Sequence, residues 1–169
     1  MKSAPTSLAR SDAPPAGLLE GIFILFGRIP DSLILFGARL FPAAVFWMSG
    51  RSKMDGWEIA ERTYVLFEHE YALPLIDPEF AARMATIAEH VFPVLLVLGI
   101  ATRFSALALL GMTAVIQIFV YPLAWPTHGL WAVCFLVVIA KGPGVFALDH
   151  LIRARFAGRA QGFEASGRI

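Results

Sequence analysis

Ionisable side chains inside long apolar segments are the residues of this chain best placed to do chemistry. Glu89 and His90 lie within one apolar run, and Arg39 lies near the middle of an earlier one. A charge in hydrocarbon costs about 2.5 kcal/mol or more even on lenient insertion scales, so such a residue usually has a partner or a task. We expect Arg39 and Glu89 to pair across a helical bundle, either as a functional site or only to hold the fold together.

His90, already named, and three further residues could take part in a site with Arg39 and Glu89. His90 follows Glu89 directly, so on a helix it points about 100° away from it. His128 begins the last apolar run, close to Tyr121 and Trp125. An aromatic, apolar cleft edged by Glu89 and His128 could admit a quinone head group, because both side chains can exchange protons near neutral pH. The alternative is a purely structural role, in which the aromatic residues form an interfacial belt and the histidine is hydrogen-bonded beside it.

The candidate polar site that follows has no assigned catalytic residue. Its members are Arg39, Glu89, His128, Tyr121 and Trp125, with His90 as the lesser candidate. We predict no metal site, because about four ligands of suitable type are needed and no third His or Cys lies at this level. No spacing motif supports haem ligation by His90 and His128, so haem is not expected; the cofactor is left open, with a quinone as the candidate. The lone Cys134 excludes an intrachain disulfide and a CxxC motif.

Membrane-spanning helices must position these residues. The chain has 169 residues, of which 57% are hydrophobic and only 16% are charged, whereas an ordinary soluble domain carries about 25% charged residues. The net charge of +1 gives no reason to expect a nucleic-acid partner. Because a span needs about 20 apolar residues in a helix, the lipid bilayer is the expected surrounding of most of this chain.

We predict an all-α fold, an antiparallel bundle of four transmembrane helices. The spans run from about Asp31 to Gly50, Met84 to Ala101, Phe104 to Leu123 and His128 to Leu148. The stretch from Leu18 to Ile29 is too short to span, and it is either an interfacial helix or a lead-in to the first span. In the long connection from Arg51 to Arg83, apolar residues at three- and four-residue spacing predict an extracytoplasmic amphipathic helix. These residues are Trp57, Ala60, Tyr64 and Phe67, and Pro74 and Pro78 are expected to end the helix.

The domain organisation is a single membrane domain between two tails. Residues 1–17 are expected to form a flexible tail, residues 18–152 the membrane domain, and residues 153–169 a basic cytoplasmic tail. Basic residues concentrate on the side that both termini share, whereas the long connection is rich in acidic residues. By the positive-inside rule, both termini lie in the cytoplasm and the long connection outside, in a bacterial inner membrane.

Several short motifs in fixed order carry a family resemblance. They are Glu89 in the second span, Gly99 to Arg103 at the short turn, Val120-Tyr121-Pro122 with Trp125 and His128, and Gly142-Pro143-Gly144 before Asp149. Arg39, the segment from Gly50 to Lys53, and Glu70-Tyr71 with Pro74-Leu75 fit the opening part of the same pattern. From Leu33 to Leu151 the chain resembles the DoxX family of small bacterial membrane proteins.

The resemblance implies a four-helix membrane bundle. One relative is associated with a thiosulfate:quinone oxidoreductase, others with membrane complexes that handle oxidative or thiol stress, and some lie in operons for copper or metal-peptide handling. No catalytic residue can be carried over from the family, and the lack of a cysteine pair argues against thiol redox chemistry here.

Two functions from different classes follow. The first is an accessory or quinone-interacting subunit of a membrane redox or stress-related system, with a protein partner in a membrane complex. The second is a non-catalytic membrane scaffold that recruits a partner through its acidic connection or basic tail. A solute conduit is disfavoured, because the third and fourth spans offer only Gln117 and Thr113 as a polar path. Whether the chain is itself an enzyme is left open.

Overall fold

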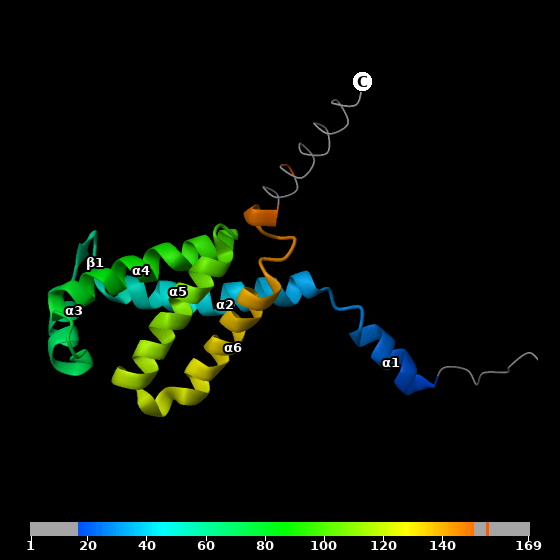
Figure 1. Cartoon of the computed structure of the whole chain (residues 1–169), viewed down its shortest axis with the longest axis horizontal. Coiled ribbons are helices and arrows are strands. Elements are labelled where there is room, and N and C mark those ends of the chain that lie inside the picture. The colour runs from blue at the N-terminus through cyan, green and yellow to red at the C-terminus, as the bar shows by residue number, and fades with distance from the viewer. Residues whose placement is uncertain (1–16, 151–154, 156–169) are drawn as a thin grey trace, which may run out of the picture. The chain divides into compact units, whose positions relative to one another are not determined.

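The computed structural model describes residues 17–150 and residue 155, and these fall into two units that divide between Pro30 and Asp31 (Figure 1). The first unit contains α1 (Leu18–Phe26), a nine-residue helix whose side chains from Ile22 to Phe26 are exposed. A helix of this length is about 14 Å long and cannot cross a bilayer core of about 30 Å. The predicted tails, residues 1–17 and 153–169, lie outside the described residues except for Gly17 and Arg155.

The second unit contains four helices that are long and apolar enough to cross a membrane, as predicted. They are α2 (Asp31–Ser52), α4 (Pro78–Leu98), α5 (Thr102–Val115) continued by the π-helix η2 (Ile116–Val120), and α6 (Trp125–Lys141) preceded by the short 3-10 helix η3 (Pro122–Ala124). In space, α2 packs against α4 and α6, and α5 packs against the same two helices.

Two of the four long helices have other bounds than the predicted spans. The second span begins at Pro78 rather than Met84, because the Asp77 side chain accepts a hydrogen bond from the backbone nitrogen of Phe80 at 2.9 Å and caps the helix there. Pro78 therefore starts a helix instead of ending one. The fourth span ends at Lys141 rather than Leu148, because Gly142 adopts a φ of +90° that a helix cannot continue through.

The long connection between α2 and α4 contains two strands and two short helices. An antiparallel hairpin of β1 (Met54–Asp55) and β2 (Glu58–Ile59) leads into α3 (Glu61–Leu66), which continues as the π-helix η1 (Phe67–Tyr71). Helical structure in this connection is therefore limited to Glu61–Tyr71, and the predicted amphipathic helix is not confirmed. Trp57 lies in the hairpin turn with 97% of its surface exposed, so it takes no part in a helix.

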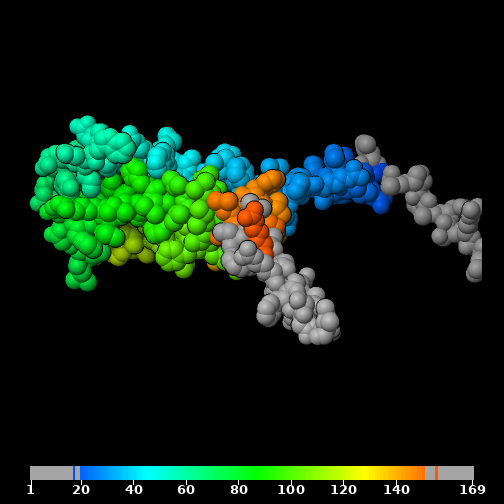
Figure 2. Space-filling model, turned by 90° about the horizontal axis from the view of Figure 1, so that it is seen from above, coloured from blue at the N-terminus to red at the C-terminus, as the bar shows by residue number. Residues whose placement is uncertain are grey.

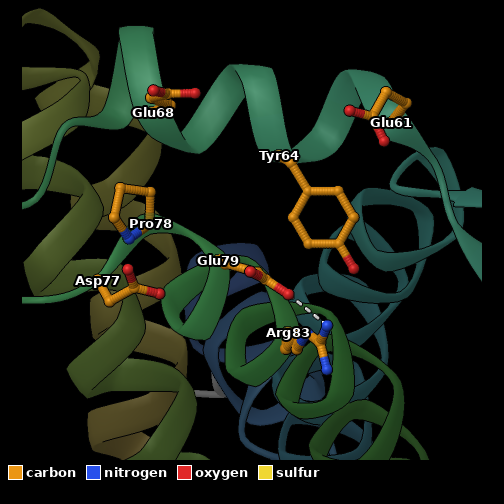
Figure 3. A pocket seen from close by; sticks show the side chains of 7 residues that line it. All are labelled: Glu61, Tyr64, Glu68, Asp77, Pro78, Glu79 and Arg83. Carbon is orange, nitrogen blue, oxygen red and sulfur yellow. Dashed lines mark hydrogen bonds and ion pairs between the residues drawn. The ribbon is translucent and has the colours of Figure 1, made fainter.

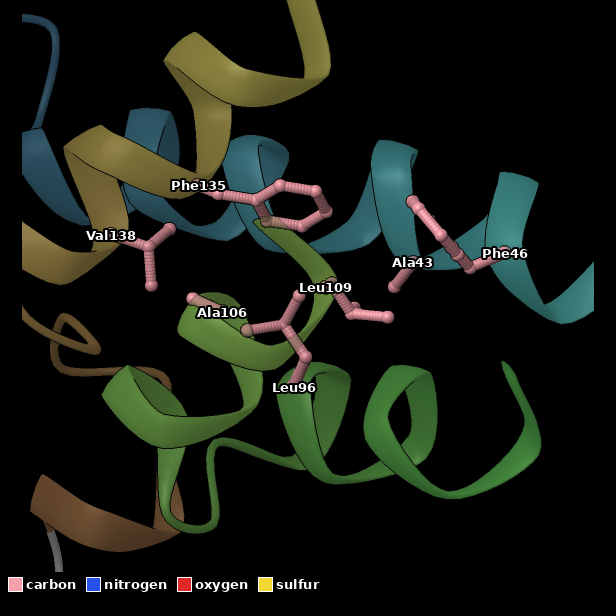
Figure 4. Close-up of a cluster of buried hydrophobic side chains, with 7 residues drawn as sticks. All are labelled: Ala43, Phe46, Leu96, Ala106, Leu109, Phe135 and Val138. Carbon is pink, nitrogen blue, oxygen red and sulfur yellow. The ribbon is translucent and has the colours of Figure 1, made fainter. Parts of the chain in front are cut away.

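The core of the bundle receives side chains from all four long helices (Figure 4). Its buried members are Ala43 and Phe46 of α2, Leu96 of α4, Ala106 and Leu109 of α5, and Phe135 and Val138 of α6. The rings of Phe46 and Phe135 lie 6.0 Å apart, so the largest side chains pack against each other where alanines leave room. This shared core fixes the relative positions of the four helices on which the polar residues sit.

The two ends of the second unit carry different elements, and they lie at opposite extremes of the bundle (Figures 1 and 2). We call the end that carries the hairpin, α3 and η1 the loop end. We call the other the tail end; there the start of α2 and the α4–α5 turn meet residues 142–150, which follow α6. Polar residues cluster at both ends.

Candidate functional site

Arg39 and Glu89 do not pair, which corrects the expectation from the sequence. Arg39 is completely buried at the tail end, where its Nη2 donates to the carbonyl oxygen of Phe146 at 2.8 Å. Glu89 contacts Ser49 instead. Arg39 precedes Ser49 on α2 by about three helical turns, or roughly 15 Å, which is beyond the reach of its side chain. The two charges of the predicted pair therefore have separate surroundings.

The partner of Glu89 is Lys53, a residue that the sequence reasoning placed outside the membrane. Lys53 Nζ lies 2.7 Å from Glu89 Oε2 and donates to Ser49 Oγ at 2.9 Å, while Ser49 Oγ donates to Glu89 Oε1 at 3.2 Å. Lys53 and Glu89 are both buried. The sequence does contain a signal for this contact. Ser49 and Lys53 are four residues apart, which is about one helical turn, so their side chains share a helix face.

Close helix packing brings these groups together. A Cβ added at Gly50 would lie 3.0 Å from the Cβ of Glu89 and 2.9 Å from Cε1 of His90, so glycine lets α2 approach α4 here. His90 itself is directed elsewhere, as predicted: its Nδ1 lies 2.7 Å from the carbonyl oxygen of Thr86, and its ring contacts Trp47. The polar cluster is thus Ser49, Lys53 and Glu89.

Glu89 also lines an apolar pocket at the loop end, which we call the Glu89 pocket. Its volume is about 290 Å³, near the lower limit of about 300 Å³ for small-molecule sites. Its walls come from η1, from α4, and from the end of α5 with η2; they include Phe67, Tyr71, Met84, Glu89, Met112 and Val120. Glu89 and Tyr71 are the two lining residues with oxygen-bearing side chains. A ring-sized head group with an apolar body fits these dimensions and this chemistry.

Both π-helices of the described chain border the Glu89 pocket. Phe67 and Tyr71 come from η1, and Ile116 and Val120 come from η2. π-helical turns are rare and occur frequently at functional sites, because the extra residue redirects side chains. Their meeting at one pocket marks this region of the bundle as the candidate site.

Two tyrosines and a carboxylate join these π-helices beside the pocket. Tyr121 donates its hydroxyl hydrogen to Glu70, and the Tyr71 and Tyr121 rings meet edge to face at 6.0 Å. Burial, followed by the charge of Glu89, raises the pKa of Tyr71. The hydrogen bond to Glu70, followed by burial, raises the pKa of Tyr121. Both phenols therefore keep their protons at neutral pH.

His128 and Trp125 line a separate groove between α5 and α6. His128 Nδ1 lies 2.7 Å from Gln117 Oε1, and Gln117 Nε2 donates to the carbonyl oxygen of Pro122 at 2.7 Å. The groove has a volume of about 290 Å³ and shares no lining residue with the Glu89 pocket. The single cleft expected between Glu89 and His128 is therefore two hollows.

The tail end is closed by contacts that the sequence reasoning missed. The carboxylate of Asp149 accepts hydrogen bonds from the backbone nitrogens of Ala101 and Thr102 at 3.1 and 2.9 Å, and from Thr102 Oγ1 at 2.8 Å. It thereby satisfies amide groups at the start of α5, whose own first residues supply no cap. The backbone nitrogen of Asp149 donates to Gly99 at 2.8 Å. Arg39 and Asp149 thus belong to a structural junction at this end of the bundle.

A third hollow lies on the loop side and is polar (Figure 3). It has a volume of about 470 Å³, and its walls carry Glu61, Glu68, Asp77 and Glu79 with Tyr64 and Arg83. Glu79 forms an ion pair with Arg83 one turn later on α4. In residues 17–150 and 155, no group of three or more His, Cys, Asp or Glu is arranged to hold a metal ion. We call this region the acidic hollow.

Comparison with known proteins identifies the chain. The family model named DoxX matches residues 34–122, more than half of its length. The chain belongs to the DoxX family. The match contains Arg39, Lys53, Tyr71 and Glu89, whereas His128 and Asp149 lie beyond it. This DoxX protein is thus a multi-pass membrane protein with four apolar helices.

A relative from Haemophilus influenzae, which carries only the name uncharacterized protein, is 29% identical over 138 residues. The alignment covers 74% of this chain and 87% of the relative. No solved structure matches the chain.

Proposed function

We propose that this DoxX protein is a quinone-interacting accessory subunit of a membrane redox or stress-related system, and that the Glu89 pocket receives the quinone head group. The observation that carries the proposal is the pocket itself: an apolar hollow of ring size with a buried, charge-paired carboxylate in its wall. An ionisable residue within a membrane span is a functional candidate by default, because its burial is costly. The proposal includes a bacterial inner membrane with both termini in the cytoplasm.

The site residues of this proposal differ in role from those expected from the sequence. Glu89, held by Lys53 and Ser49, provides the polar group of the pocket, and Tyr71 with Tyr121 provides its border. His128 and Trp125 line the neighbouring groove and serve as the comparison site. Arg39 stabilises the tail end and makes no contact with the pocket.

The test is a binding measurement with a matched pair of pocket-filling variants. Ala88→Phe fills the Glu89 pocket, and Ala132→Phe fills the His128 groove to the same extent. The full chain in lipid nanodiscs is titrated with a short-tailed benzoquinone, and binding is read by calorimetry. Ala88→Phe is expected to weaken binding by about tenfold or more, whereas Ala132→Phe leaves it unchanged. Equal effects of the two variants, or no binding by the parent chain, would refute the proposal.

The acidic hollow supports a second candidate function, recruitment of a basic protein partner. Four carboxylates around one hollow create a negative potential that attracts positive segments. A photo-crosslinking residue at Glu68 should then capture a partner in cells, whereas one at the exposed Trp57 should not. Reversing Glu61 to lysine should abolish the captured band. A scaffold of this kind needs no ligand in the Glu89 pocket, so the quinone titration separates the two functions.

A further inference from the structure

The short helix α1 carries its large apolar side chains mainly on one side. When positions are counted from Glu20 at about 100° per residue, Leu25, Ile22, Phe26 and Phe23 fall at about 140°, 200°, 240° and 300°. They cover about 160° of the helix surface, which is the width expected of the apolar face of an amphipathic helix. We call these four side chains the apolar arc.

The opposite side of α1 has few large side chains. Glu20 and Gly21 lie there at about 0° and 100°, and Ile24, at about 40°, is the one large apolar residue between them. Glu20 and Gly21 are both exposed. The helix therefore has one side suited to hydrocarbon and one suited to water.

The apolar arc is exposed. Phe23 is 70% exposed, and Leu25 and Phe26 are each 61% exposed. Contiguous exposed apolar side chains of this kind mark a surface that binds a membrane or another molecule. An isolated helix of nine residues is also marginal in water, so α1 needs a covering on its apolar arc to remain helical.

The chain itself keeps α1 close to a membrane surface. Four residues separate Phe26 from Asp31, where α2 begins, so these two residues are at most roughly 18 Å apart. Asp31 forms an exposed ion pair at 3.3 Å with Lys141, the last residue of α6. Because charged side chains avoid hydrocarbon, this pair marks the level at which both spans meet water. The 22 residues of α2 already give about 33 Å of helix, so α1 is not needed to complete a span.

We infer that α1 is an interfacial anchor, which binds the lipid surface of the leaflet where α2 begins. Its apolar arc lies among the outermost parts of the acyl chains, and its Glu20–Gly21 side faces the head groups and water. From Gly17 to Pro30 the chain has one acidic residue, Glu20, and one basic residue, Arg28. These charges cancel, so the apolar arc supplies the binding and zwitterionic lipid is sufficient. The anchor is independent of any ligand in the Glu89 pocket.

Fluorescence quenching in nanodiscs tests where the arc lies. The full chain with Cys134→Ala receives a single cysteine, Phe23→Cys in the arc or Glu20→Cys opposite it, and the cysteine is labelled with bimane. Phospholipids brominated near the head group should quench the Phe23 label several-fold more than aqueous iodide does, and iodide should be the stronger quencher at Glu20. Equal access of iodide to both labels would place α1 in water and overturn the inference. Strongest quenching by bromines at the chain ends, or no quenching of the Phe23 label by lipid or iodide, would overturn it in favour of a membrane-inserted or a protein-covered helix.

Two glutamate variants test the sidedness of the anchor. Phe23→Glu places a charge in the apolar arc, whereas Ile24→Glu places the same charge on the opposite side. Hydrogen exchange at the amides of residues 22–26 should become about tenfold faster or more in Phe23→Glu and stay within about twofold of the parent chain in Ile24→Glu. Equal acceleration in both variants would refute the one-sided contact. The parent chain should show the same protection in zwitterionic nanodiscs as in nanodiscs with anionic lipid, and a need for anionic lipid would refute binding through apolar area.

Discussion

Removing the Lys53 amine should destabilise the bundle through the carboxylate that it leaves behind. In Lys53→Met, Glu89 stays buried with Ser49 Oγ at 3.2 Å as its remaining side-chain hydrogen-bond donor. Breaking a buried pair on one side costs about 3–5 kcal/mol, whereas replacing both members by apolar residues is often close to neutral. The double variant Lys53→Met/Glu89→Met loses both charges and leaves only the Ser49 hydroxyl unpaired, at a cost of about 1–2 kcal/mol. The double variant should therefore be more stable than either single variant.

The free energy of unfolding is measured by reversible titration of the purified chain from bicelles into SDS. The two single variants and the double variant form a double-mutant cycle. The control cycle combines Glu89→Met with Arg39→Met, because the structure separates these two residues by roughly 15 Å along the bundle. That cycle should be additive within about 0.5 kcal/mol, whereas the Lys53–Glu89 cycle should show a coupling of about 1.5 kcal/mol or more. Coupling of Glu89 to Arg39 rather than to Lys53 would refute the assignment of the ion pair.

Two further predictions concern the tail end and use the same unfolding titration. Gly99→Ala should lower the free energy of unfolding by several kcal/mol, because Gly99 has a φ of +74° and an added Cβ would lie 2.5 Å from Arg39 Nη1. The control is Gly129→Ala, whose added Cβ meets nothing within 4 Å, so it should leave the free energy of unfolding unchanged or raise it slightly. A loss of equal size in the two alanine variants would contradict the packing at Gly99. Asp149→Ala should cost about 1–2 kcal/mol and speed hydrogen exchange at the start of α5, since it removes the cap on Thr102. Unchanged exchange at Thr102 would show that the cap is not needed.

The spans could be predicted from the sequence, because in a chain of this composition a long run of apolar residues indicates a transmembrane helix. The pairing of charges could not, because it depends on depth. Ending the first span at Gly50 places Lys53 in the connection outside the membrane and leaves Arg39 as the only lysine or arginine within the first two predicted spans, although α2 continues to Ser52 and Lys53 is buried.

The candidate site was predictable in part for a related reason. Glu89 stood out because its charge interrupts an apolar run. Tyr71 and Asp149 entered only as parts of the family motifs and not as site residues, because a tyrosine near a membrane surface and an aspartate after a span are both common. Their roles come from π-helical turns and from the chain reversal at Gly142 and Gly144, which local patterns of hydrophobicity do not encode.

The contact between Arg39 and Phe146 also sets an order of events during synthesis. Arg39 lies in the first long helix, and the carbonyl that accepts its hydrogen bond is 107 residues further along the chain. At about 5–20 residues per second, a ribosome needs roughly 5–20 s to supply that partner. Throughout that interval the nascent bundle contains an arginine without its native acceptor. A chain that stops after Lys141 would keep it in that state permanently, and pulse-chase labelling should show its faster degradation than a chain that ends after His150.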